Sequence, residues 1–125
     1  MMRTQGMLLA LAALLLAAAC RPAPPPAAAV YQVRGESRQL PVAPARDLMI
    51  RHEAIPDFKD EAGKVVGMEA MTMPFTLAPG VELGGLAPGD RVEFTLEVRW
   101  DDPANLARIT RLGRLPPGTR LAWDS

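Results

Sequence analysis

Short hydrophobic runs, separated by Gly and Pro turn pairs, constrain the fold of this chain more than any other feature. In the clearest run, Arg91–Trp100, apolar residues alternate with polar ones. Alternation with a period of two predicts a strand that buries one face. Turn pairs such as Pro79-Gly80 and Gly84-Gly85 interrupt the chain too often for long helices. The sequence therefore predicts an all-β domain.

The strand pattern recurs along the chain between these turns. The expected strands are Tyr31–Leu40, Asp47–Glu53, Met71–Leu77, Arg91–Trp100 and Ala107–Leu112. Because a small open sheet would leave two edges exposed, we expect a five-stranded β-barrel that closes or nearly closes. The charged segment Asp57–Gly67 is expected to be a loop.

The N-terminus has the features of an export signal. Arg3 supplies a positive charge, and the apolar run from Met7 to Ala19 is too short to span a membrane as a helix. The small residues that lead into Cys20 resemble the lipobox of bacterial lipoproteins, in which the Cys is lipidated and becomes the new N-terminus. Simple cleavage after Ala19, which leaves a free thiol at Cys20, is the alternative.

This signal suggests how the chain is divided. We expect a signal peptide over residues 1–19, a lipidated Cys20 with a Pro/Ala-rich linker over residues 20–30, a barrel over residues 31–113 and a C-terminal extension over residues 114–125. Pro-rich linkers are extended and semi-rigid, so this one would hold the barrel away from a membrane. The expected location is the periplasm or cell envelope, with the protein as a membrane-tethered monomeric lipoprotein.

Composition argues against several classes of function. The 14 basic and 14 acidic side chains give zero net charge, without the electrostatic footprint of a nucleic-acid-binding protein. One Cys and one His cannot build a disulfide framework or a Cys/His zinc site. The sequence shows no nucleophile elbow, phosphate-binding loop or pair of catalytic acids, so we expect no enzymatic activity.

Methionines gather in one segment of the chain. Met68, Met71 and Met73 lie within six residues, and Met71 and Met73 share one face of an expected strand. The only His, His52, lies at the end of the preceding expected strand. If these strands are neighbours, one imidazole and up to three thioethers converge, a donor set that selects Cu(I) over harder ions. Methionines in strands also commonly fill a core, and the pattern alone leaves both interpretations open.

Three stretches of the chain carry a family resemblance. In order, they are His52-Glu53-Ala54-Ile55-Pro56, Met71-Thr72-Met73-Pro74-Phe75 and Leu86-Ala87-Pro88-Gly89-Asp90. Together they resemble the CusF-like family of periplasmic copper-binding proteins, small OB-like barrels that bind Cu(I) and Ag(I). The resemblance implies an OB-like five-stranded barrel in which His52, Met71 and Met73 are the metal ligands, with Cu(I) as the ion and Ag(I) as a second candidate.

The chain departs from the family pattern near the expected site. Where some members place a Trp that caps the metal, this chain has Met68, which is either a further ligand or a hydrophobic lid. Glu53 and Glu69 are candidates to orient His52 from the second coordination shell. The longer segment Asp57–Gly67 forms either a hairpin over the site or a docking surface for a partner.

The leading hypothesis is a non-catalytic envelope protein that holds Cu(I) as a metallochaperone or buffer. It would deliver the ion to a copper efflux system or to a copper-enzyme assembly factor. The alternative is a structural or adaptor lipoprotein whose barrel binds an envelope protein, with the methionine cluster serving as packing.

Overall fold

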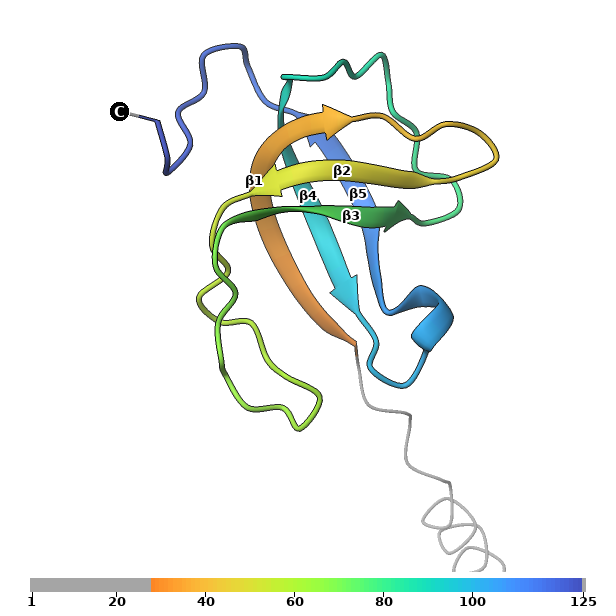
Figure 1. The fold of residues 1–125 in the computed structure, drawn as a ribbon, viewed down its shortest axis with the longest axis vertical. Coiled ribbons are helices and arrows are strands. Elements are labelled where there is room, and N and C mark those ends of the chain that lie inside the picture. The colour runs from red at the N-terminus through yellow and green to blue at the C-terminus, as the bar shows by residue number, and fades with distance from the viewer. Residues whose placement is uncertain (1–27, 125) are drawn as a thin grey trace, which may run out of the picture.

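The computed structural model describes residues 28–124, and these form five strands that close into a barrel (Figure 1). The strands are β1 (Ala29–Gln39), β2 (Asp47–His52), β3 (Met71–Leu77), β4 (Arg91–Val98) and β5 (Ala107–Arg114). A short 3₁₀ helix, Pro103–Asn105, precedes β5. The prediction of an all-β, five-stranded OB-like barrel is confirmed. The predicted signal peptide (residues 1–19), Cys20 and most of the predicted linker lie outside the described residues.

The strands follow the order β1-β2-β3-β5-β4, and β4 pairs with β1 to close the barrel. All neighbouring strands are antiparallel except β3 and β5, which are parallel. β1 bends around the barrel, as Figure 1 shows, because its first part pairs with β4 and its last part with β2. Only Gly35 and Glu36 have partners on both sides.

The alternation in the sequence builds the core. In β4, Val92, Phe94, Leu96 and Val98 point inward and are at most 3% exposed. Phe75 of β3 packs against Phe94, with ring centroids 5.2 Å apart. Burial of each such side chain contributes about 1.5–3 kcal/mol to stability, and this burial fixes which face of each strand lies inside.

The strand boundaries differ from the sequence-based prediction by a few residues. β1 begins at Ala29, so the end of the predicted linker is part of the barrel. β4 ends at Val98 because the chain turns there, with the Asp102 N–H donating to the Arg99 carbonyl at 3.2 Å.

In residues 28–124, no helix is long and apolar enough to cross a membrane.

The loop between β2 and β3 is an irregular hairpin. Single bridges join Ile55 to Met68 and Lys59 to Val65. Phe58 anchors the loop by packing on Tyr31 of β1, with ring centroids 5.3 Å apart. Figure 1 shows this hairpin projecting from the end of the barrel where β2 finishes and β3 begins.

Candidate metal centre

His52 is the last residue of β2, and its imidazole is fully buried. Its Nδ1 lies 2.7 Å from the carbonyl oxygen of Glu53. Because a carbonyl oxygen only accepts, this hydrogen bond requires a proton on Nδ1, and the neutral ring then carries its lone pair on Nε2. The ring also lies edge-on to Phe75, with centroids 5.7 Å apart.

The Nε2 atom of His52 has no hydrogen-bond partner. Among the buried side-chain nitrogen and oxygen atoms of the described residues, only Nε of Arg108 shares this condition. A buried, unsatisfied acceptor costs about 1–3 kcal/mol, so native proteins rarely retain one without a reason. A bound soft cation would use this lone pair, and the imidazole therefore fits the role of a metal ligand.

Met71 and Met73 face the same interior as His52. In the β2–β3 ladder, His52 lies directly opposite Met71, and Ile50 lies opposite Met73. Directly opposite residues of an antiparallel pair share a face, with Cβ atoms about 4.5–5.5 Å apart. Met73 packs against the core, whereas Met71 is 43% exposed. The thioether of Met71 is therefore at the rim of the barrel, beside the imidazole.

Met68 lies just beyond this pair in the same register. Its backbone exchanges two hydrogen bonds with Ile55, at 2.8 and 2.9 Å. His52 and Ile55 are three residues apart but both are buried, so the regular alternation is interrupted between them. Met68 faces the core as a half-buried side chain. It thus lies three positions beyond the His52–Met71 pair along the same two segments of chain.

The two candidate acidic residues have different surroundings. Glu53 contacts His52 through its backbone carbonyl, while its carboxylate pairs with Arg34 at 3.0 Å. Glu69 is exposed to solvent. Glu53 therefore contacts the imidazole through its main-chain carbonyl and not through its carboxylate.

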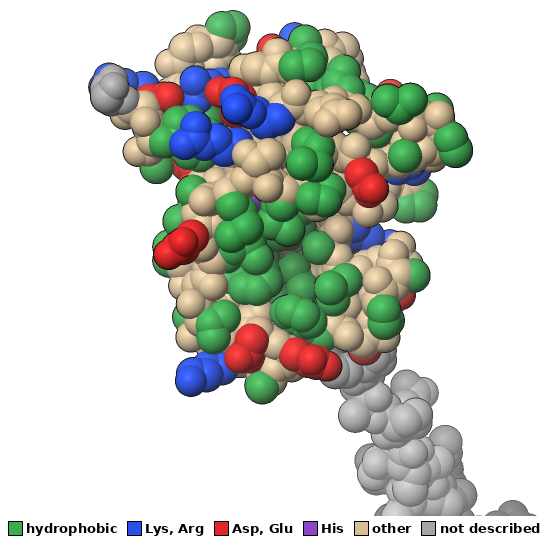
Figure 2. Space-filling view, viewed as in Figure 1, with side chains coloured by type: hydrophobic (Ala, Val, Ile, Leu, Met, Phe, Trp, Pro, Cys, Tyr) green, Lys and Arg blue, Asp and Glu red, His purple; other side chains and the backbone are tan. Residues whose placement is uncertain are grey.

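The site opens where the barrel is incompletely paired. β3 pairs with β5 only at Thr76 and Leu77, so the first half of β3, which carries Met71 and Met73, has a strand neighbour only in β2. Figure 2 shows hydrophobic side chains gathered on this face, below β3 and beside the hairpin. Val65 and Val66 of the hairpin are also exposed. An ion could reach the thioethers from this side.

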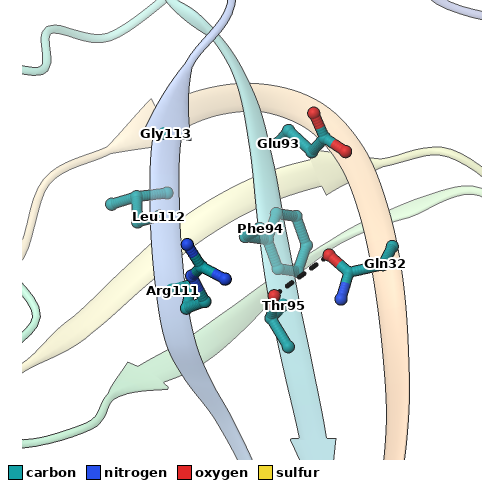
Figure 3. A pocket seen from close by; sticks show the side chains of 7 residues that line it. All are labelled: Gln32, Glu93, Phe94, Thr95, Arg111, Leu112 and Gly113. Atoms are coloured by element: carbon teal, nitrogen blue, oxygen red, sulfur yellow. Dashed lines mark hydrogen bonds between the residues drawn. The ribbon is translucent and has the colours of Figure 1, made fainter.

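Other parts of the described structure fit a soft metal less well. A depression over β1, β4 and β5 is lined by polar side chains together with Phe94 and Leu112, and in it the Thr95 hydroxyl donates to Gln32 at 3.0 Å (Figure 3). Its lining contains no sulfur or imidazole. Within residues 28–124, no group of three or more His, Cys, Asp or Glu side chains is placed to hold a metal. The His52 and methionine cluster is therefore the best candidate for a soft-metal site.

The two Trp residues lie against other side chains. Trp100 contacts Phe58 of the hairpin, with ring centroids 6.4 Å apart. Trp123 stacks on the guanidinium of Arg51, whose central carbon is 4.3 Å from the ring centroid.

Gly35 is a site residue that sequence reasoning missed. It lies opposite His52 in the β1–β2 ladder, and a Cβ there would be 2.5 Å from the carbonyl oxygen of Arg51. A glycine inside an otherwise alternating strand is a signal for such a close approach of two backbones. The C-terminal extension was expected over residues 114–125, but its contacts with the barrel were not predicted, because no periodic pattern marks them.

Comparison with known proteins agrees with this fold. The family model for the copper-binding periplasmic protein CusF matches residues 30–111. The apo-CusF structure (residues 6–88) from Escherichia coli aligns with a TM-score of 0.54 at 19% identity, over 77% of this chain and 99% of that one. The C-terminal domain of SilB from Cupriavidus metallidurans aligns with a TM-score of 0.53 at 27% identity, over 74% of this chain and 99% of that one.

A CusF structure with Ag(I) aligns with a TM-score of 0.51 at 20% identity, over 70% of this chain and 99% of that one. No curated protein sequence matches this chain. The family match covers nearly the whole barrel, from the second residue of β1 into β5, and includes His52 and the methionine cluster. The chain belongs to the CusF family of copper-binding periplasmic proteins.

Proposed function

We propose that this protein binds Cu(I), and also Ag(I), through Nε2 of His52 and the thioethers of Met71 and Met73, with Met68 as a third sulfur ligand. The observation that carries the proposal is the buried, unpartnered Nε2 of His52 on the residue directly opposite Met71. A nitrogen lone pair beside neutral sulfur donors is a set that soft monovalent ions prefer. The family description as copper-binding and the silver ion in a CusF structure support the choice of ions.

The site suits a carrier that takes up and releases its ion. All proposed ligands are neutral, so the charge of the monocation is not cancelled and the ion is held without a strong ionic bond. Met71 is partly exposed at the rim. A partner's ligands could replace Met71 first and the other ligands after it, one at a time. We propose a non-catalytic metallochaperone or buffer that delivers Cu(I) to a copper efflux system or to a copper-enzyme assembly factor.

We further propose that Cys20 anchors the protein to a membrane as a lipoprotein, with the Pro/Ala-rich linker as tether. β1 begins at Ala29, so the linker would end where the barrel begins. Cys20→Ser should move the protein from the membrane fraction to the soluble fraction of the cell envelope. A wild-type protein that is already soluble would contradict the anchor.

The metal site can be tested by anaerobic Cu(I) titration against a chromophoric competitor. The protein should lack residues 1–19 and carry Cys20→Ser, so that no thiol competes for the ion. Met71→Leu combined with Met73→Leu removes two sulfurs at nearly constant volume, and it should abolish tight binding. Met49→Leu is the matched control, because Met49 lies between the buried Leu48 and Ile50 and therefore faces the other side of β2.

Two results would contradict the proposal. One is the absence of stoichiometric Cu(I) binding by the parent protein. The other is unchanged binding by the double variant, which would make the methionine cluster a packing feature. Either result would favour an adaptor protein whose barrel binds an envelope partner.

A further inference from the structure

The C-terminal segment, residues 115–124, folds back onto the end of the barrel that holds His52. It lies beyond residues 30–111, which the family model matches. Leu121 anchors it and is only 3% exposed. Trp123 stacks on Arg51 of β2, and Asp124 accepts a hydrogen bond from Arg91 at 3.0 Å.

One contact of this segment reaches the residue next to His52. The Ala122 N–H donates to Oε2 of Glu53 at 2.7 Å. Arg34 of β1 donates to the same carboxylate, with Nε 3.0 Å from Oε1 and one terminal nitrogen 3.2 Å from Oε2. The Glu53 side chain is therefore held from two directions, by β1 and by the C-terminal segment.

Glu53 in turn holds the imidazole through its backbone. Its N–H donates to the Arg34 carbonyl at 2.9 Å, and its own carbonyl lies 2.7 Å from Nδ1 of His52. Glu53 lies beyond the end of β2, where the ladder to β3 no longer fixes the peptide. The position of the Glu53 peptide is therefore fixed by the contacts of its N–H and of its side chain.

We propose that Glu53 is the positioning residue of the metal site and that the C-terminal segment acts through it to keep the proton of His52 on Nδ1. The hydrogen bond made by one ring nitrogen determines which nitrogen carries the lone pair. A fixed Glu53 carbonyl keeps Nε2 unprotonated and aimed at the ion. The ring therefore does not have to reorient when the ion binds. This inference rests on the proposed metal-binding function.

Ala122→Pro tests the proposal by removing a single donor. Ala122 is the second residue of a turn in which the Asp124 N–H donates to the Leu121 carbonyl at 2.9 Å, a position that favours proline. Ala122→Ser is the matched control, because it keeps the N–H. Glu53→Gln is a second variant that weakens the pairing with Arg34 and leaves the backbone unchanged.

Two measurements should be made on the mature protein with Cys20→Ser. In the metal-free protein, ¹⁵N NMR of the His52 ring should show a single Nδ1–H tautomer, and Ala122→Pro and Glu53→Gln should shift it toward a mixture. With Ag(I) as the probe, both variants should lose affinity by about tenfold, the lower end of the effect of losing an outer-shell partner. Ala122→Ser should match the parent protein in both measurements.

Unchanged ring shifts and unchanged Ag(I) affinity in both variants would overturn the proposal and make the segment a packing element. Lower affinity in Ala122→Ser as well would also overturn it, because that variant keeps the hydrogen bond. If the parent protein binds no Ag(I) or Cu(I), the proposed function fails, while the ring shifts still decide whether Glu53 positions the imidazole.

Discussion

Gly35 lies where the backbones of β1 and β2 approach each other beside His52. A Cβ at this position would be 2.5 Å from the carbonyl oxygen of Arg51 and 2.7 Å from Cγ2 of Ile50. One of these contacts is to backbone, which cannot rotate away as a side chain can. The space for His52 between its two neighbouring strands thus depends on a residue that has no side chain.

Gly35→Ala should therefore destabilise the barrel. We expect a loss of about 1–3 kcal/mol in the free energy of unfolding, as for other overpacked cores, measured by urea denaturation. Gly113→Ala is the control, because the nearest atom to its Cβ would be 3.9 Å away. Equal stability of the two variants would contradict the steric argument.

Met68 provides a second test at the scale of the residue. If it is a ligand, X-ray absorption of the Cu(I) form should show one nitrogen and three sulfur scatterers. Met68→Leu should reduce the sulfurs to two and weaken binding, while the half-buried side chain keeps its packing. Two sulfurs in the parent protein, or no change in the variant, would assign Met68 to a hydrophobic lid.

Among the elements, the C-terminal segment depends on a charged carboxylate. Asp124 accepts a hydrogen bond from the Leu121 N–H at 2.8 Å and lies beside Arg91, and these contacts lower the pKa of its carboxyl. A lowered pKa in the folded protein means that the charged form stabilises the folded segment. This contribution is complete above the pKa of the unfolded carboxyl, about 3.9, and is lost as the pH falls through the folded value.

Acid should therefore loosen the C-terminal segment before the barrel unfolds. The amide resonance of Leu121 should titrate below about pH 4, at a pH lower than that of an unfolded Asp. Asp124→Asn keeps an acceptor oxygen but removes the charge, so this titration should disappear. A Leu121 amide that does not respond to pH in the parent protein would argue against the contact.

The pairing of the first half of β3 determines how accessible the methionines of the candidate site are. Because it pairs only with β2, its methionines are less enclosed than the residues near Thr76 and Leu77, where β5 joins. A metal held by His52 and by the methionines would link β2 to β3 in addition to their backbone hydrogen bonds. Because β5 does not pair with the first half of β3, this part of the barrel has fewer backbone hydrogen bonds, and a bound ion would stabilise it.

For the whole molecule, a metal that links β2 to β3 should raise the free energy of unfolding. A ligand that binds only the folded state at 100 times its Kd contributes about 2.7 kcal/mol. Thermal unfolding of the mature protein with Cys20→Ser should shift upward with added Ag(I), and the Met71→Leu plus Met73→Leu variant should show no shift. An equal shift in both proteins would indicate that the ion binds elsewhere.

Local patterns in the sequence were sufficient to predict the class of fold, and they singled out the candidate ligands, which the family resemblance then assigned to a metal. Alternation in Arg91–Trp100 and turn pairs such as Pro79-Gly80 act over a few residues, so the strands can be recognised without tertiary information. The methionines cluster along the chain itself, and their sulfur chemistry does not depend on the fold. The all-β barrel was predicted correctly. The strand ends differ from the prediction by a few residues, as at Val98, where a turn ends β4.

The tertiary structure alone decided how these residues meet. His52 and Met71 are opposite each other because of the β2–β3 register, and Ala122 reaches Glu53 from 69 residues away. The group of Glu53 that contacts the imidazole is its carbonyl, which no residue type reveals, since every residue has one. Side-chain identity and periodicity are local properties of a sequence, whereas register, barrel closure and the partner of a buried atom follow from packing the whole chain.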